Sequence, residues 1–72
     1  SDVGSWTALW EIGAQDAQGN VTSGDVVLHD VSNSFIRAEK RLVSAIGVRD
    51  LVIIETDDAI LVAPRNRAQD VK

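Results

Sequence analysis

Short runs of aliphatic and β-branched residues follow one another from Val26 onward, and this pattern limits the fold more than any other feature of the chain. Turn-forming residues separate the runs, which occupy positions 26–30, 34–38, 41–46, 51–55 and 59–63. Runs of this length and composition are typical of β-strands, and no amphipathic helix of useful length fits between them. The sequence therefore predicts a mainly β domain over residues 23–65.

Two β architectures fit these runs. Their spacing of eight or nine residues suits a small antiparallel meander, with Glu39-Lys40 and Asp57-Asp58 at the turn tips. A second periodicity favours a left-handed parallel β-helix, whose coil has three flat sides of about six residues with one inward aliphatic residue on each. Aliphatic residues recur at this spacing at Ile36, Leu42, Val48, Ile54 and Ile60. An offset of 18 lays residues 34–45 on 52–63, and the pattern alone leaves both architectures open.

One short helix is expected before the β domain, over residues 5–13. Ser5 suits the N-cap of this helix, and Gly13 suits the left-handed residue that follows its end. Its apolar face carries Trp6, Leu9 and Trp10. Such a helix is too short to be stable alone, so we expect it to pack against another part of the protein.

Polar segments flank the β domain on both sides. Residues 14–25 contain glycine and a Gly19-Asn20 turn signal, and they predict a linker. After Pro64 ends the last strand, Asn66 and Gln69 form a capping pair, so residues 66–72 predict the start of a helix. Because this helix begins so close to the last residue, we expect the chain to be a segment of a longer protein.

Charge and composition exclude several classes of function. The first 36 positions carry five acidic residues and no Lys or Arg, and the formal net charge of the chain is −4. Phosphate neutralisation supplies most nucleic-acid affinity, so we expect no nucleic-acid partner. The sequence contains no Cys, which excludes disulfides and thiolate metal sites, and no apolar run approaches the ~20 residues of a membrane helix. We expect a cytoplasmic protein that does not enter a membrane.

The first six residues, SDVGSW, combine features of a phosphate and metal site. Asp2 lies just before the expected helix, and free N–H groups at a helix start favour a phosphate. Gly4 allows a ligand to approach the backbone closely, and a carboxylate beside a phosphate site commonly shares Mg²⁺ with it. The alternative is that Asp2 is only a solvated charge that interacts favourably with the helix start.

Several longer motifs carry a resemblance to a known enzyme family. They are DVGSW at 2–6, SNSFIR at 32–37, AIGVRDLVIIETDDA at 45–59 and QDVK at 69–72. With them, the sequence resembles the bacterial mannose-1-phosphate guanylyltransferases over essentially its whole length, including the bifunctional enzymes with a mannose-6-phosphate isomerase domain. The resemblance implies that residues 1–22 are the C-terminal edge of a nucleotidyltransferase domain and its linker. It also implies a left-handed β-helix over 23–65 and the start of a helix over 66–72.

The resemblance implies a reaction in which GTP and mannose 1-phosphate give GDP-mannose and pyrophosphate. Asp2 matches the family carboxylate that binds Mg²⁺, while Gly4 and Ser5 shape the backbone around the substrate. No catalytic residue of the family falls within this chain, which we expect to be inactive alone. The family also implies a homodimer formed through the β-helix. The alternative is a non-catalytic β-helix module for interaction or dimerisation.

The remaining polar residues favour structural roles. His29 has no second His and no nucleophile in a plausible strand register, so it is expected to be a surface or half-buried side chain. Arg65 and Arg67 are expected to be solvated charges near a helix start rather than a phosphate clamp. Asp57-Asp58 is interpreted as a turn tip rather than a metal site.

Overall fold

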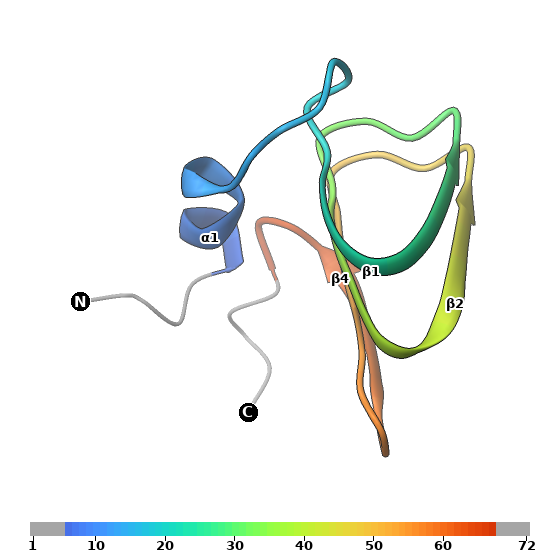
Figure 1. The fold of residues 1–72 in the computed structure, drawn as a ribbon. Helices are drawn as coiled ribbons and strands as arrows, with labels where there is room; N and C mark the ends of the chain where they lie inside the picture. The colour runs from blue at the N-terminus through green and yellow to red at the C-terminus, as the bar shows by residue number, and fades with distance from the viewer. Residues whose placement is uncertain (1–5, 68–72) are drawn as a thin grey trace.

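The computed structural model describes residues 6–67 as one short helix and one four-stranded sheet (Figure 1). The elements are α1 (Trp6–Ile12), β1 (Val21–His29), β2 (Phe35–Ile46), β3 (Leu51–Glu55) and β4 (Ile60–Pro64). The strands lie in the order β1-β2-β3-β4, and the first three are parallel. This arrangement confirms the predicted mainly β fold with a β-helix. Within residues 6–67, no helix has the length and apolar character needed to cross a membrane.

From Val26 onward the coils of the β-helix repeat after 17 residues, whereas Val21–Gly24 pair with Phe35–Ala38 at an offset of 14. Val26 pairs with Val43 and Phe35 pairs with Val52, while the isolated bridge between Ser32 and Arg49 keeps the same spacing. Figure 1 shows β1 and β2 as strongly curved ribbons that lie alongside each other. The predicted offset of 18 is therefore wrong by one residue, which in a strand moves every side chain to the opposite face.

The one-residue error changes which aliphatic residues form the core. Ile36 pairs with Ile53 rather than Ile54, and Ile36 is fully buried inside the coil. Ile54 is buried on the other face of the sheet. Leu42 and Ile60, which the six-residue pattern places inside, are 56% and 66% exposed.

Left-handed backbone residues form the corner that follows each long strand. Asp30 and Asn33 have φ values of 60° and 53° in the corner after β1, and Gly47 and Asp50 have 66° and 57° in the corner after β2. These four positions are 17 residues apart in pairs, so the two corners have the same shape and stack. Asn, Asp and Gly are the residues that tolerate this conformation best.

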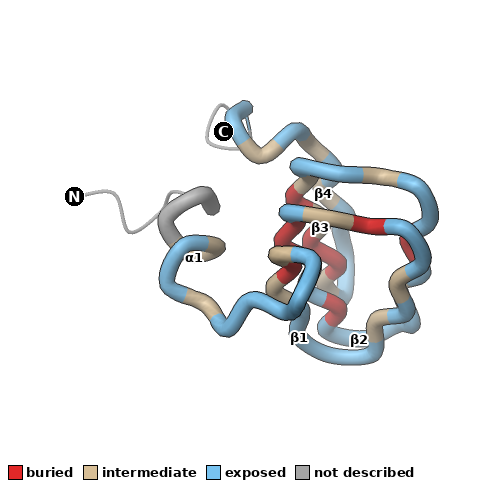
Figure 2. Tube along the Cα trace, turned by 90° about the horizontal axis from the view of Figure 1, so that it is seen from above, coloured by how far each residue is buried: buried red, intermediate tan, exposed pale blue. Residues whose placement is uncertain are grey.

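Two apolar clusters lie on opposite faces of the sheet. The inner cluster fills the coil and contains the buried residues Val31, Ile36 and Ala45. The outer cluster contains Phe35, Val52 and Ile54, against which Leu9 and Trp10 of α1 pack. Figure 2 shows the buried residues concentrated where the strands lie side by side, with α1 beside them.

The last strand reverses the direction of the chain. β4 pairs antiparallel with β3, and the connecting turn is closed where Thr56 N donates to Ala59 O at 2.9 Å. Asp57-Asp58 is therefore a turn tip, as the sequence predicts. Glu39-Lys40, in contrast, lies inside the continuous strand β2, so the prediction of a turn there is wrong.

The segments before and after the β domain were predicted as a helix with a linker and as the start of a second helix. The predicted N-terminal helix is confirmed as α1, which ends before Gly13. Gly13 does not have a positive φ, so the prediction of a left-handed residue there is wrong. A side chain on Gly13 would meet Val21 at 2.8 Å. The expected linker over 14–25 is largely structured, because β1 already begins at Val21 and Asn20 is buried. Residues 65–67 form a turn, and the rest of the expected C-terminal helix lies outside the described residues, as does Ser5.

Gly24 offers a test of the tight corner inside β1. Its φ is 88°, and an added Cβ would overlap the carbonyl oxygen of Ala38, whereas a Cβ on Gly47 would meet no atom within 4 Å. We expect Gly24→Ala to lower the free energy of unfolding by about 3 kcal/mol or more, since strain and overpacking add. Gly47→Ala carries only the left-handed backbone strain, about 1 kcal/mol. Chemical unfolding followed by circular dichroism measures both, and equal losses would contradict this account of the corner.

Candidate functional site

The predicted metal and substrate residues lie at the edge of what the structure describes. Asp2, Gly4 and Ser5 all precede residue 6, so they fall outside the described residues and their roles stay predictions. The structure does describe α1, which follows them directly, and the contacts that hold this helix on the β-helix. These contacts are the structural part of the candidate site.

Trp10 fixes α1 to the β-helix through three kinds of contact. Its side chain packs on the outer cluster, and its indole N–H donates to the carbonyl oxygen of Gly19 at 2.7 Å. The guanidinium carbon of Arg65 lies 3.9 Å from the centroid of the indole ring. A cation stacked on Trp is attracted by the negative face of the ring, while the buried N–H needs an acceptor.

The prediction that Arg65 is a solvated charge is wrong. Its side chain is only 21% exposed, lies over Trp10 and approaches the Asp50 carboxylate at 3.6 Å. Sequence reasoning missed this role because the ring it stacks on lies near the other end of the chain. Arg67 is exposed, as predicted.

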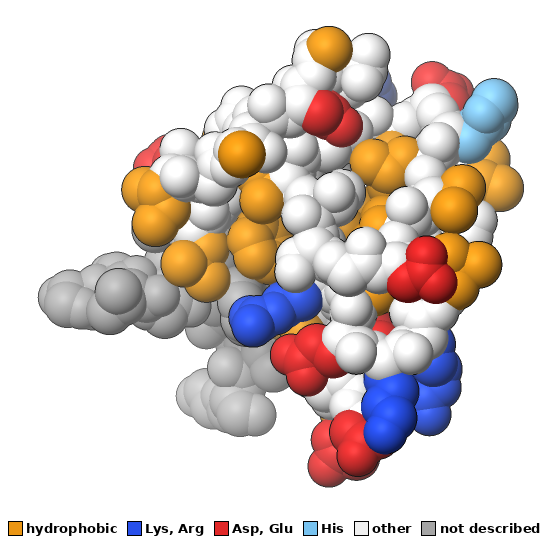
Figure 3. All heavy atoms as spheres, viewed as in Figure 1, with side chains coloured by type: hydrophobic (Ala, Val, Ile, Leu, Met, Phe, Trp, Pro, Cys, Tyr) orange, Lys and Arg blue, Asp and Glu red, His pale blue; other side chains and the backbone are white. Residues whose placement is uncertain are grey.

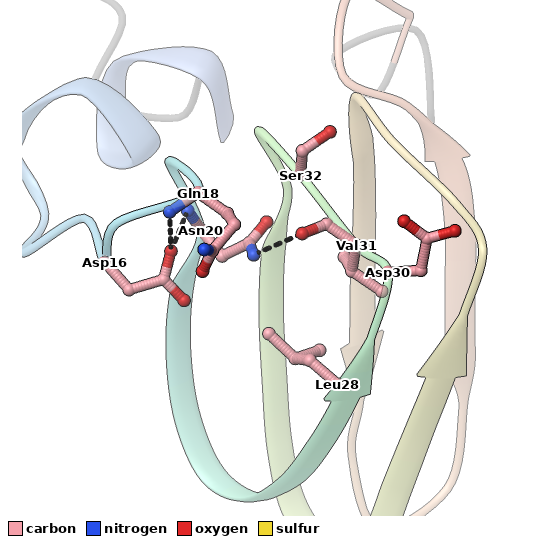
Figure 4. A pocket seen from close by; sticks show the side chains of 7 residues that line it. All are labelled: Asp16, Gln18, Asn20, Leu28, Asp30, Val31 and Ser32. Atoms are coloured by element: carbon pink, nitrogen blue, oxygen red, sulfur yellow. Dashed lines mark hydrogen bonds between the residues drawn. The ribbon is translucent and has the colours of Figure 1, made fainter.

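A polar hollow of about 510 Å³ lies between the loop before β1 and the corner after it (Figure 4). It is lined by Asp16, Gln18, Asn20, Leu28, Asp30, Val31 and Ser32. One Asp16 oxygen accepts the backbone N–H groups of Gln18 and Asn20, each at 2.9 Å. The hydrogen bond from the Asn20 backbone, more than any other cause, lowers the pKa of Asp16. The Asp16 carboxylate therefore stabilises the turn formed by residues 16–20.

Asn20, which lines this hollow, caps the N-terminal end of the β-helix by satisfying backbone groups there. It is 2% exposed, and its side-chain nitrogen donates to Val31 O at 2.8 Å while its oxygen accepts the N–H of Ser34 at 3.0 Å. In the next coil, the corresponding Val48 O accepts the backbone N–H of Ser32 at 3.2 Å, and the corresponding Leu51 N–H donates to Ser34 Oγ at 3.1 Å. The amide of Asn20 therefore supplies the hydrogen bonds that a preceding coil would make.

Glu55, the last residue of β3, caps backbone groups at the other end of the β-helix. Its side chain is 2% exposed, and one carboxylate oxygen accepts the backbone N–H groups of Lys40 and Arg41 at 2.8 and 3.1 Å. The second oxygen accepts Arg41 Nη1 at 2.7 Å. The backbone bonds from Lys40 and Arg41, outweighing burial, lower the pKa of Glu55 from 4.5 to about 2. Such a carboxylate is held as an anion and performs a structural task.

The other polar candidates keep the structural roles expected of them. His29 is exposed at the end of β1. Asp57 and Asp58 lie in the turn between β3 and β4, where Asp57 approaches Lys40 Nζ at 3.4 Å and Asp58 accepts the Thr56 hydroxyl. Within residues 6–67, no group of three His, Asp or Glu side chains is arranged to hold a metal ion.

The fold agrees with the comparison to known domains. Residues 24–72 match the MannoseP isomerase/GMP-like beta-helix domain, and the chain belongs to this family. The match covers β2, β3 and β4 completely and most of β1.

Two bacterial proteins contain similar segments. The chain is 57% identical over all 72 residues to mannose-1-phosphate guanylyltransferase of Escherichia coli K12, and 50% identical to the alginate biosynthesis protein AlgA of Pseudomonas aeruginosa. It spans only 15% of the length of each. A crystal structure described as mannose-1-phosphate geranyltransferase from Thermus thermophilus superposes with a TM-score of 0.84 at 34% identity, over 99% of this chain and 22% of that one.

The lowered pKa of Glu55 predicts an acid-sensitive β-helix. Because its folded pKa is below its unfolded pKa, its carboxylate stabilises the fold fully above about pH 4.5, and this contribution is lost as the pH falls toward about 2. We expect Glu55→Gln to be less stable than wild type at pH 7 and to lose less stability on acidification. Thermal unfolding between pH 7 and pH 2 measures the difference.

Glu39→Gln is the matched control for this experiment. Glu39 forms an exposed pair with Arg37 at 3.5 Å, with both side chains nearly half exposed. Exposed pairs contribute little, so this variant should follow the wild-type pH dependence. The account of Glu55 fails when the Glu55 and Glu39 variants show the same pH dependence.

Proposed function

We propose that this chain is a segment of a mannose-1-phosphate guanylyltransferase, in which it supplies one edge of the active site and a non-catalytic β-helix. The observation that carries the proposal is 57% identity to such an enzyme across the full chain, including the DVGSW segment that lies before the β-helix domain.

In the proposed reaction, a phosphate oxygen of mannose 1-phosphate attacks the α-phosphorus of GTP, and pyrophosphate leaves as the bond to the β-phosphate oxygen breaks. Mg²⁺ would neutralise the charge that the phosphates develop. Asp2 would provide a carboxylate ligand, and Gly4 and Ser5 would let the backbone approach the substrate. Because residues 6–67 contain no metal-binding cluster, the remaining ligands would come from substrate phosphates, water or other parts of the whole protein.

Substitution of Asp2 in the whole protein tests the proposal. We expect Asp2→Asn to lower kcat by about 100-fold or more, since the amide cannot supply the negative charge that the metal site needs. Pyrophosphate release from GTP and mannose 1-phosphate measures turnover, and circular dichroism checks folding. Glu11→Gln, at an exposed position on α1, is the control and should keep wild-type turnover.

Each remaining outcome has a definite meaning. Equal turnover in wild type and Asp2→Asn would keep the enzyme but reduce Asp2 to a favourable charge near α1. Absence of turnover in the wild type would refute the proposed reaction. The 72-residue chain alone should make no GDP-mannose, and synthesis by it would contradict the non-catalytic role of the β-helix.

Exposed apolar side chains favour a second role, which is to join two copies of the protein. Val62 lies opposite Ile53 in the antiparallel pair, so Val62 and Ile60 continue the inner face of the sheet past the last coil. They are 59% and 66% exposed. Figure 3 shows further hydrophobic side chains along the right-hand edge of the view, beyond the bend of β1, with acidic and basic side chains below them. Because a second copy would present the same open end, we propose a homodimer formed through this face.

A charged double variant tests the dimer. In the whole protein, Ile60→Glu with Val62→Glu should shift the mass in solution from dimer to monomer without loss of fold, because both side chains are already exposed. Light scattering measures the mass. Ile12→Glu, at an 81% exposed position on α1, should leave the dimer intact. A double variant that remains dimeric would exclude this face as the interface.

A further inference from the structure

β3 begins a third coil, and residues 56–63 have the length and the pattern needed to complete it. The second half of β2, residues 43–46, pairs in parallel with residues 26–29 of β1 at an offset of 17. We call these two segments the second wall. The same offset carries residues 43–46 onto 60–63, which form the apolar run ILVA. No insertion or deletion is needed, because β3 pairs with β2 at this offset as well.

The apolar pattern of this run matches the inside of the coil. The second wall contributes to the inner cluster the side chains of Val26, Leu28, Val43 and Ala45. At the offset of 17, Ile60 and Val62 take the positions that follow Val43 and Ala45. In the observed strand β4 they are 66% and 59% exposed. Ile60 and Val62 would therefore be buried in a completed third coil, whereas the observed hairpin exposes them.

The second wall has an open edge on which such a strand fits. Residues 43–46 pair with β1 on one side, and among residues 6–67 no strand pairs with them on the other side. In Figure 1 the second wall stands on the right of the view and contains only the curved halves of β1 and β2. Residues 42–46 carry no charged side chain. An uncharged edge with unpaired backbone groups is a template for a further strand.

Two features make the hairpin the major arrangement. Pro64 corresponds to Gly47 at the offset of 17, and Gly47 has a φ of 66°. The ring of proline fixes φ near about −65°, so a completed third coil cannot turn the same corner. In the hairpin, β4 pairs with β3 along its whole length, and Arg65 directly after it lies over the Trp10 ring at 3.9 Å.

We propose that residues 56–63 switch between two placements, the observed β3–β4 hairpin and a completed third coil in which residues 60–63 pair in parallel with 43–46. Two packings of one sequence can differ by little free energy, and a chain that carries both patterns has this property. The third coil buries Ile60 and Val62, so it removes the face that joins two copies. This control of dimerisation rests on the proposed function, whereas the switch itself does not.

A disulfide trap detects the third coil. At the offset of 17, Leu61 lies beside Ser44 on the outer face of the second wall. In the hairpin, Leu61 pairs with Ile54 and packs on the outer cluster. Neighbouring strands place two Cys within disulfide range. We expect Ser44→Cys with Leu61→Cys, made in the whole protein, to form a disulfide within one chain in oxidised glutathione. Mass spectrometry of the linked peptides identifies it.

Further pairs check the register and the hairpin. Ile46→Cys with Ala63→Cys is a second trap at the same offset. Ser44→Cys with Val62→Cys is the matched control, because a shift of one residue puts the two side chains on opposite faces. It should stay reduced. Ile54→Cys with Leu61→Cys joins a pair of the observed hairpin and should link readily.

The rate of trapping reports how much of the third coil is present. Arg65→Met removes the cation from the Trp10 ring and should raise this rate about two- to fivefold, because it weakens the hairpin alone. Circular dichroism checks that each variant is folded. Folded proteins in which neither trap links within one chain would overturn the switch. Links between two chains, or equal linking in the control pair, would overturn it as well.

The mass of the linked proteins separates the switch from the proposed dimer. By light scattering, the third-coil trap should be a monomer and the hairpin trap a dimer. A third-coil trap that stays dimeric would overturn the control of dimerisation and leave the switch standing. If the wild type and the hairpin trap are both monomers, the proposed homodimer is wrong, and the disulfide result alone decides the switch.

Discussion

Every coil of a β-helix relies on its neighbours for backbone hydrogen bonds, and a structure with so few coils must satisfy two ends by other means. Asn20 does so at the corner after β1, where its side-chain nitrogen donates to Val31 O and its side-chain oxygen accepts the N–H of Ser34. Glu55 does so above the long bend of β2, where one carboxylate oxygen accepts two backbone N–H groups. Buried backbone groups without partners are costly, so the small apolar core between these two side chains depends on both of them.

The bends of the two coils differ in length, and Glu55 compensates for the longer one. In β1 the bend is tight and needs Gly24, whereas in β2 the bend contains extra residues around Lys40 and Arg41. The longer bend exposes backbone N–H groups that β3 cannot reach as a strand, since β3 ends at Glu55. The Glu55 carboxylate accepts these N–H groups instead. The same contact therefore stabilises both the end of β3 and the bend of β2.

The fold class could be predicted from the sequence, but the pairing register between coils could not, for a physical reason. In β3 both faces of the sheet are apolar, one toward the coil and one toward α1, so Leu51 to Ile54 form a continuous apolar run without alternation. Such a run cannot reveal which residues point inward, and the offset between coils is then uncertain by one residue. Of the left-handed corner residues, Asn33 and Asp50 lie in the turn-forming stretches between the predicted β runs, whereas Asp30 lies at the end of the run 26–30. The candidate site was predictable only where the local DVGSW motif carried it, and its role remains a prediction. Nothing in the sequence around Arg65 indicates that its side chain contacts Trp10, which lies near the other end of the chain. From the sequence, Glu55 is only a charged residue at the end of a strand, and its contact with the bend of β2 is visible only in the structure.

The reversal at β4 has a consequence for assembly. A stack of parallel coils is a template on which further chains could polymerise without limit, as in fibrils. β4 runs antiparallel to the coils and ends at Pro64, which lacks a backbone N–H. A copy arriving at this edge finds no parallel strand to extend, which disfavours an open filament and is compatible with the closed, two-fold pair proposed above.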